Sequence, residues 1–384
     1  MTEVLAPPLS LSISPRVRAP LLVRSPAVNV EKSSKSTMKV FPPAFHITIS
    51  SCLLSLAIGV FTHQIVSAGF EEGLAAYKRG DYATALQELR PLAERGNVAA
   101  QFNLGLMYDN GQGVAQDYKE AVNWYRKAAE QGNVAAQFNL GLMYENGQGV
   151  AKDYKEAVNW YRRAAEQGDA AAQFYLGLSY GAGRGVPRDD KEAARWFSRA
   201  AVQGFAPAQY NLAHMYYDGK GLPRDDKEAL LWFRKAAAQG VAEAQQNLGL
   251  MYAAGRGVRR DDKEALLWFR KAATQGLTEA QYTLGLMYAA GRGVPQNYKE
   301  ALTWYRNAAE QGYPSAQNNM GLLYYEGQGV PQDYVRAHMW FNLAGASGEK
   351  QAVKNRDMLE KRMTPSQIEE AQRLAREWKP KKSK

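Results

Sequence analysis

The sequence predicts an all-α protein in which helical hairpins stack into a solenoid. Tryptophan recurs every 36 residues, apolar residues within each period follow helical spacing, and glycine and aspartate mark the helix ends. A fixed period of this length is typical of tandem units that stack, since one hairpin alone cannot bury its apolar face. The seven periodic tryptophans, of eight in the chain, are Trp124, Trp160, Trp196, Trp232, Trp268, Trp304 and Trp340.

Each period contains two predicted helices. In the first, Ala100, Leu104 and Tyr108 recur at steps of four and so share one helix face. Gly105 follows Leu104 and leaves room for a neighbouring helix to approach closely. The second helix carries alanines and aromatic residues around each tryptophan at steps of three and four.

The segments between the helices contain recognisable end signals. Gly111 and Gly113 end the first helix, because glycine readily adopts the left-handed conformation found there. Asp117 and Glu120 have the spacing of a capping box, in which the aspartate accepts from the backbone and the glutamate reaches back. Gly132 ends the second helix. The Gly-x-Gly loops lack the third glycine and the lysine of a phosphate-binding loop, so turn geometry accounts for them.

The period divides the chain into segments. Residues 100–351 contain seven 36-residue units, preceded by a divergent hairpin over residues 69–99. Residues 352–378 form helices that close the end of the stack. Residues 379–384 are a basic tail, which we expect to be a solvated terminus. The units start at Ala100, Ala136, Ala172, Ala208, Ala244, Ala280 and Ala316.

The N-terminal segment predicts export. No charged residue occurs from Val40 to Val66, Lys39 precedes this run, and Ser67 and Ala68 supply small residues for cleavage. Residues 38–68 therefore read as a signal peptide starting at Met38, and residues 1–37 as an upstream extension. An uncleaved membrane anchor is the alternative. We expect a periplasmic protein, or alternatively a secreted one or one anchored in the inner membrane and facing the periplasm.

Composition excludes several classes of protein. With 46% hydrophobic and 22% charged residues, the chain is neither disordered nor a multi-span membrane protein. Its one cysteine, Cys52, excludes an intrachain disulfide framework, and its four histidines disfavour a metal enzyme, so no metal or cofactor is expected. The net charge of +10 lies mostly at the two ends, and no basic stripe with interleaved aromatic residues predicts nucleic-acid binding. Membrane contact is expected only if the N-terminal segment stays uncleaved.

The repeated pattern resembles the SEL-like repeat, a branch of the tetratricopeptide superfamily. The shared motif is Ala-x-x-x-Leu-Gly-x-x-Tyr-x-x-Gly-x-Gly-Val-x-x-Asp-x-x-x-Ala-x-x-Trp-x-x-x-Ala-Ala-x-x-Gly, and Ala213, Met320 and Asn297 are single departures from it. The resemblance implies a right-handed superhelix that serves as an adaptor for other proteins. Some secreted members carry a cysteine pair in each hairpin and are described as penicillin-binding, but this chain lacks those cysteines.

By tetratricopeptide geometry, the first helices line the concave side. One row of positions there, with a row of leucines one turn on, would form a ladder of aromatic and leucine side chains, suited to an extended peptide or a partner helix. The row turns polar at Gln246 and Asn318, which favours binding in the N-terminal half. In the alternative, these side chains pack between neighbouring units and expose little. The candidate protein-binding residues are Phe102, Phe138, Phe174, Tyr210, His214, Gln246, Tyr282 and Asn318.

The predicted function is therefore a non-catalytic scaffold that binds a protein or peptide. A secreted protein that binds host molecules is one alternative. A cell-wall or β-lactam-processing enzyme is another, because Ser347 and Lys350 have the spacing of a serine–lysine nucleophile. No companion motif follows that pair, so we regard the spacing as chance.

Overall fold

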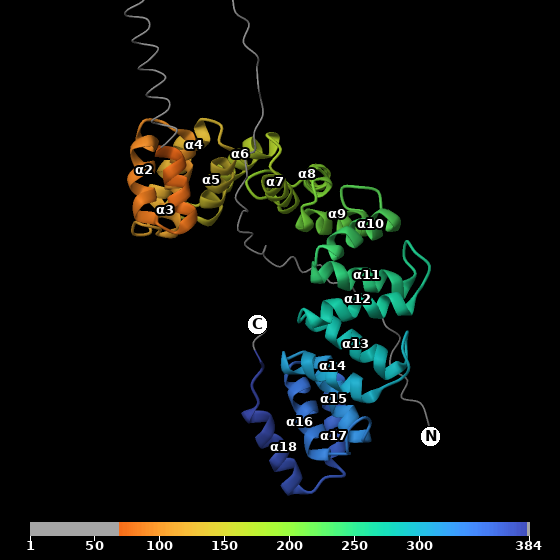
Figure 1. Ribbon diagram of the computed structural model, residues 1–384. Coiled ribbons are helices and arrows are strands. Elements are labelled where there is room, and N and C mark those ends of the chain that lie inside the picture. The colour runs from red at the N-terminus through yellow and green to blue at the C-terminus, as the bar shows by residue number, and fades with distance from the viewer. Residues whose placement is uncertain (1–68, 382–384) are drawn as a thin grey trace, which may run out of the picture.

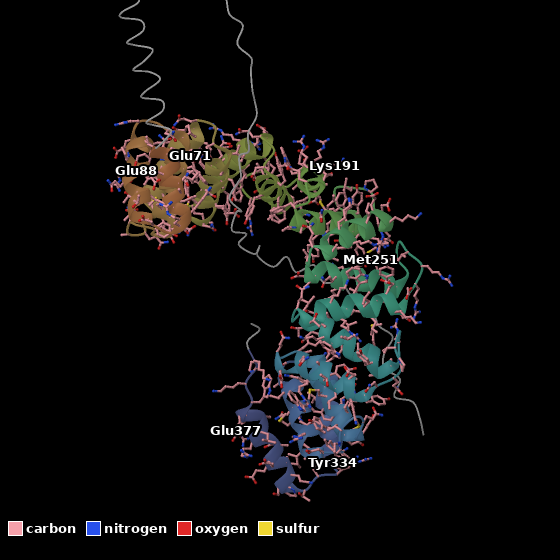
Figure 2. The ribbon with its side chains drawn as sticks, viewed as in Figure 1. Glu71, Glu88, Lys191, Met251, Tyr334 and Glu377 are labelled. Carbon is pink, nitrogen blue, oxygen red and sulfur yellow. The ribbon has the colours of Figure 1, made fainter. Side chains whose placement is uncertain are left out.

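The computed structural model describes residues 69–381, and across that range every regular element is a helix. A helix over residues 69–79 and α2 (Tyr82–Glu94) form the N-terminal hairpin. The hairpins then follow one another in chain order along a curved stack (Figure 1). Glu88 of α2 and Glu377 of α18 mark its opposite ends (Figure 2). The predicted upstream extension, the signal peptide and the end of the basic tail lie outside the described residues.

The seven units each contribute a first and a second helix. The first helices are α3 (Val98–Asn110), α5 (Val134–Asn146), α7 (Ala170–Ala182), α9 (Ala206–Asp218), α11 (Ala242–Ala254), α13 (Thr278–Ala290) and α15 (Pro314–Glu326). The second helices are α4 (Tyr118–Glu130), α6 (Tyr154–Glu166), α8 (Asp190–Val202), α10 (Asp226–Ala238), α12 (Asp262–Thr274), α14 (Tyr298–Glu310) and α16 (Tyr334–Ala346). Two further helices, α17 (Lys350–Glu360) and α18 (Pro365–Glu377), follow.

A glycine on each first helix allows the two helices of a hairpin to pack closely. A Cβ atom added to Gly105 would lie 2.6 Å from Cδ1 of Tyr125, whose ring is fully buried. The fourth unit has Ala213 at this position, opposite Phe233. The plane of Phe233 lies 61° from that of its neighbour Tyr210, whereas the corresponding angle in the first unit is 37°.

The second glycine of each loop joins one unit to the previous one. Gly149 has a φ of 71°, and a Cβ atom there would lie 2.1 Å from the carbonyl oxygen of Tyr118. No side chain fits so close to backbone, and the left-handed conformation independently favours glycine. These glycines therefore set how closely successive hairpins stack.

Aspartates begin most second helices, as predicted. The carboxylate of Asp117 accepts hydrogen bonds from the backbone amides of the second and third helical residues, at 2.9 and 3.2 Å. The reciprocal bond from Glu120 is not formed, so the expected capping box is half correct. In two units the equivalent glutamate bonds an indole instead: Trp232 Nε1 donates to Glu228 at 3.2 Å. The full capping box occurs at the start of α18.

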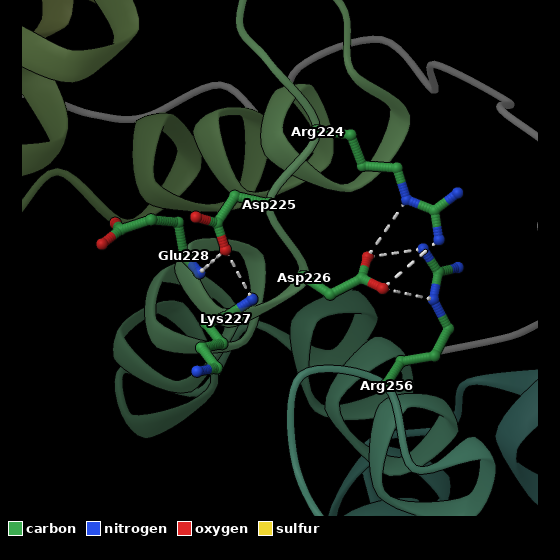
Figure 3. Close-up of polar contacts among 6 residues, drawn as sticks. All are labelled: Arg224, Asp225, Asp226, Lys227, Glu228 and Arg256. Atoms are coloured by element: carbon green, nitrogen blue, oxygen red, sulfur yellow. Dashed lines mark hydrogen bonds and ion pairs between the residues drawn. The ribbon is translucent and has the colours of Figure 1, made fainter.

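Ion pairs also link neighbouring units in the middle of the stack. Arg256, in the loop of the fifth unit, donates to the Asp226 carboxylate of the fourth at 2.6 Å, and Arg224 approaches the same group at 3.3 Å (Figure 3). These hydrogen bonds lower the pKa of Asp226 below its usual range. Beside it, Asp225 accepts from the amides that begin α10. Asp225 thus caps α10, while Asp226 forms an ion pair with Arg256 of the next unit.

A ladder of buried glutamines runs through the stack. Gln101 donates to the carbonyl of Ala93 at 3.0 Å and accepts from Gln131 at 2.8 Å, and this arrangement recurs from unit to unit. The ladder stops at Gln317, because Ser347 stands where the next glutamine would be. Oε1 of Gln317 is consequently buried without a hydrogen-bond partner.

Helices α17 and α18 pack on α16 and so cover the last repeat. His338 of α16 is fully buried, and its Nε2 lies 2.8 Å from Oε1 of Glu360 on α17. The rings of Trp340 and Trp378 meet edge to face at 6.1 Å. The C-terminal segment therefore supplies the apolar cover that an eighth unit would otherwise give.

Candidate protein-interaction face

The first helices present one continuous surface, which we call the first-helix face. It consists of residues 99, 102, 103 and 106 of α3 and the residues at 36-residue intervals from them on the other first helices. These positions share one helix face, while Ala100, Leu104 and Met107 on another face are fully buried. Contacts between successive first helices join the surface, as where Phe138 and Tyr175 meet edge to face at 5.4 Å.

The structure divides the predicted binding row. Five of the eight side chains are partly exposed, and three are buried, with exposed fractions of 6%, 5% and 8% for Phe138, Phe174 and Asn318. These three side chains pack against neighbouring residues and expose little surface, as the alternative to a binding row predicts. The partly exposed residues are Phe102, Tyr210, His214, Gln246 and Tyr282.

Two specific neighbours explain the buried members. Tyr175 stands where most units have asparagine, and its ring lies 5.4 Å from Phe138 and 5.6 Å from Phe174. It therefore packs against both phenylalanines. Asn318 is buried at the end of the stack and accepts a hydrogen bond from Asn355 of α17 at 2.9 Å. The tyrosine was visible in the sequence, but its role depends on how far one unit rotates against the next.

His214 is part of the packing, although its position predicts a surface or groove residue. Its ring lies 4.6 Å from Tyr210 and 5.0 Å from Phe233, and its Nε2 accepts a hydrogen bond from the Asn247 amide at 2.9 Å. Burial lowers the pKa of His214 to about 4. The imidazole is consequently neutral at pH 7, which leaves no titration of this group near pH 6.

The first helices carry negative charge only. None of the seven contains lysine or arginine, whereas every second helix contains at least one. At neutral pH the uncharged His214 adds no cation. The acidic residues of the first helices are Asp109, Glu145, Asp218, Glu243, Glu279 and Glu326.

The opposite side of the stack has an apolar strip that sequence reasoning missed. Leu231 and Leu267 are 41% and 45% exposed on α10 and α12, and Val202 is 68% exposed on α8. The first two units have Asn123 and Asn159 at the position of these leucines. That change from asparagine to leucine was the signal available in the sequence.

Neither a metal centre nor a serine–lysine nucleophile is assembled by the described residues. Between residues 69 and 381 no group of three histidine, cysteine or acidic side chains could hold a metal ion. Ser347 and Lys350 are both exposed, and their side chains form no hydrogen bond with each other among the described contacts. No helix in that range is long and apolar enough to cross a membrane.

The fold is a solenoid of helical hairpins, and comparison with known proteins gives its family. The Sel1 repeat profile matches seven consecutive segments: residues 98–133, 134–169, 170–205, 206–241, 242–277, 278–313 and 314–349. The chain belongs to the Sel1 repeat proteins, which are generally protein–protein interaction modules and typically non-catalytic. Each matched segment begins two residues before the predicted unit, at the start of a first helix.

Two solved structures resemble the chain over most of its length. A Sel1 repeat protein from Oxalobacter formigenes is 35% identical, with a TM-score of 0.61, over 77% of this chain and 90% of that one. The protein c5321, a protective antigen present in uropathogenic Escherichia coli strains that displays an SLR fold, is 30% identical, with a TM-score of 0.53, over 87% and 94%. No match is found among curated proteins.

Proposed function

We propose that this protein is a non-catalytic scaffold that holds a protein or peptide partner against its first-helix face, the concave side in tetratricopeptide geometry. The observation that carries the proposal is the row of partly exposed aromatic and leucine side chains repeated along that face. Apolar side chains that stay partly open to solvent along a continuous surface are typical of interaction sites. Family membership supports a protein partner.

A cross-linking pull-down with the full chain tests the proposal. Leu142 is a partly exposed residue of the first-helix face on α5, and Leu231 is an exposed leucine on α10 on the opposite side. We expect Leu142→Lys to remove cross-linked partners that Leu231→Lys retains, with similar melting temperatures for the two variants. Partners lost only with Leu231→Lys would place binding on the second helices and contradict the proposal.

We further propose that the protein is exported, with the periplasm as its compartment. The apolar, uncharged run that follows Lys39 supports this, and an uncleaved segment would leave the repeats anchored to the inner membrane. Cell fractionation combined with N-terminal sequencing tests it, because periplasmic protein should begin at Gly69. Full-length protein in the cytoplasm would contradict export.

A secreted protein that binds host molecules is a second candidate. Its support is the similarity to the protective antigen of uropathogenic Escherichia coli, which extends over 94% of that chain. The same fractionation separates the two candidates, since only the host-facing protein should accumulate in the culture medium.

A further inference from the structure

We propose that the C-terminal half of the first-helix face, over α9 to α15, binds a cationic protein segment whose arginine or lysine side chains lie against Tyr210 with Glu243 and against Tyr282 and Tyr313 with Glu279. This inference rests on the proposed scaffold function and specifies the chemistry of the partner. Four observations support it.

The first observation is the separation of charge between the two sets of helices. The seven first helices contain six acidic residues and no basic one, while every second helix contains at least one lysine or arginine. The basic groups that reach the first helices come from other elements, such as the loop residue Arg256 over the ring of Tyr217. The first helices themselves therefore offer a partner only negative or neutral side chains. Such a field attracts positively charged segments and disfavours acidic ones.

The second observation is that helix stability does not explain four of the six acids, whereas Glu243 and Glu279 lie in the first turns of α11 and α13, where the helix dipole favours them. Asp109, Glu145, Asp218 and Glu326 all lie in the last turn of their helices. The negative end of the helix dipole is there, so an acidic side chain is unfavourable and a basic one would be favoured. Charge at these positions thus costs stability, as is common for residues kept for binding.

The third observation is that the carboxylates of the two halves differ in their hydrogen bonds and ion pairs. Asp109 and Glu145 in the N-terminal half accept hydrogen bonds from buried tyrosine hydroxyls, at 3.2 and 2.6 Å, and Arg184 lies 4.0 Å from Glu145. Glu243 and Glu279 are exposed and form no ion pair or side-chain hydrogen bond with any described residue. Glu326 is likewise exposed without a described partner, and Asp218 lies 3.8 Å from Lys220. Glu243 and Glu279 are therefore among the carboxylates available to a partner.

The fourth observation is the aromatic surface beside these two glutamates. Tyr282 and Tyr313 are both partly exposed, with ring centroids 5.1 Å apart. The negative charge of Glu279 contributes to the raised pKa of Tyr313, and that of Glu243 adds to burial in raising the pKa of Tyr210 to about 12. Glu279 and Tyr282 are three residues apart on α13 and so lie on one helix face. A carboxylate beside an aromatic face is the arrangement that binds a guanidinium or ammonium group.

The residues equivalent to Ala99 in the seven units show where carboxylates first appear on the first-helix face. They are alanine in the first three units, proline in the fourth and glutamate in the fifth and sixth. The N-terminal half of the face therefore offers alanine, aromatic and leucine side chains, and the C-terminal half adds free carboxylates. The partner segment is expected to be apolar at one end and basic at the other.

Fluorescence anisotropy with the full chain tests the proposal. The probe is a fluorescein-labelled dodecapeptide of alternating arginine and alanine, and a glutamate–alanine peptide serves as the negative probe. The test variant is Glu243→Gln with Glu279→Gln. The matched control is Glu130→Gln with Glu166→Gln, which removes the same charge from exposed positions on α4 and α6.

We expect the arginine peptide to bind, the glutamate peptide not to bind, and the test variant to weaken binding about tenfold, equivalent to losing two exposed ion pairs. The control should bind like wild type, and all proteins should melt alike. Equal weakening in both variants, or no binding to wild type, overturns the proposal. If the pull-down loses its partner with Leu142→Lys but keeps it with the double glutamine variant, the scaffold function holds and this inference fails.

Discussion

The two halves of the repeat array begin their first helices in different ways. In the N-terminal half, over residues 98–205, the side chains of Asn97, Asn133 and Asp169 each accept a hydrogen bond from the helix that follows. In the C-terminal half, over residues 206–349, no side chain caps the first helices. The residues at the cap positions there are Phe205, Val241, Leu277 and Tyr313.

The apolar residues of the C-terminal half contact the preceding unit. The ring of Phe205 lies 5.3 Å from Phe174, and that of Tyr313 lies 5.1 Å from Tyr282. One cluster of buried side chains accordingly runs from Phe174 to Met251. In the N-terminal half the clusters are smaller, although the smallest, which contains Phe269, lies in the C-terminal half. The comparison shows that the first helices start with a side-chain cap in one half and with an apolar residue packed at the boundary between units in the other.

Removal of a buried ring should have the largest effect and should reveal this difference. Tyr125 and Phe233 occupy the same position in the first and fourth units, and both are fully buried. Each change to alanine should cost about 3–5 kcal/mol. In native-state hydrogen exchange, Phe233→Ala should increase exchange from α7 to α12, and Tyr125→Ala from α3 to α6 only. If both variants increased exchange over the same number of helices, the two halves would not differ in how strongly neighbouring units are coupled.

A pH-dependent effect should follow from His214. Its pKa is about 4 in the folded protein and near 6.5 when unfolded, so the unfolded chain binds more protons between these values. Its contribution therefore makes the protein less stable as pH falls from 6.5 to 4, by up to about 3 kcal/mol. His214→Leu, which introduces the leucine found in the other units, should remove this component of the urea-unfolding free energy. Identical pH profiles for variant and wild type would show that the folded pKa is not lowered.

Exchanging the cap residues between the halves should have a smaller effect. Asn133→Val removes the hydrogen bond from the Ala136 amide, at 2.8 Å, and should cost about 1 kcal/mol. Val241→Asn adds such a cap but removes an apolar contact between units, so its net effect should be below about 0.5 kcal/mol. Urea unfolding measures both. A Val241→Asn variant destabilised more than Asn133→Val would mean that the apolar contact far outweighs a cap.

The smallest expected effect is a gain in stability at the end of the glutamine ladder. Ser347→Gln should supply the missing donor to Oε1 of Gln317 and raise stability by about 0.5–1 kcal/mol. Ser347→Ala is the control and should leave stability within a few tenths of wild type. A glutamine variant no more stable than the alanine variant would show that the buried oxygen is already satisfied by water.

The sequence predicted the repeat, the two helices of each unit and the role of glycine at close contacts, because each depends on local spacing. It did not predict which side chains of the first-helix face are exposed. Whether Tyr175 packs on Phe138 and Phe174, and whether His214 lies between Tyr210 and Phe233, depends on the rotation between units. That rotation arises from many small contacts and leaves no single sequence signal.

The prediction that Glu120 bonds back to the backbone of Asp117 was wrong for a related reason. The spacing of Asp117 and Glu120 fits a capping box, but it also places each glutamate four residues before a tryptophan. In α10 and α12 the indole nitrogen of the tryptophan donates a hydrogen bond to the glutamate carboxylate. Local spacing permitted both bonds, and tertiary packing of the tryptophan decided between them.

The most direct measurement is hydrogen exchange on the full chain, alone and in complex with the partner obtained by pull-down. Binding along the first-helix face predicts protection in α3, α5, α7, α9, α11, α13 and α15, with a salt-sensitive part over α11 and α13 beside Glu243 and Glu279. Protection confined to the second helices, around Leu231 and Leu267, would contradict it.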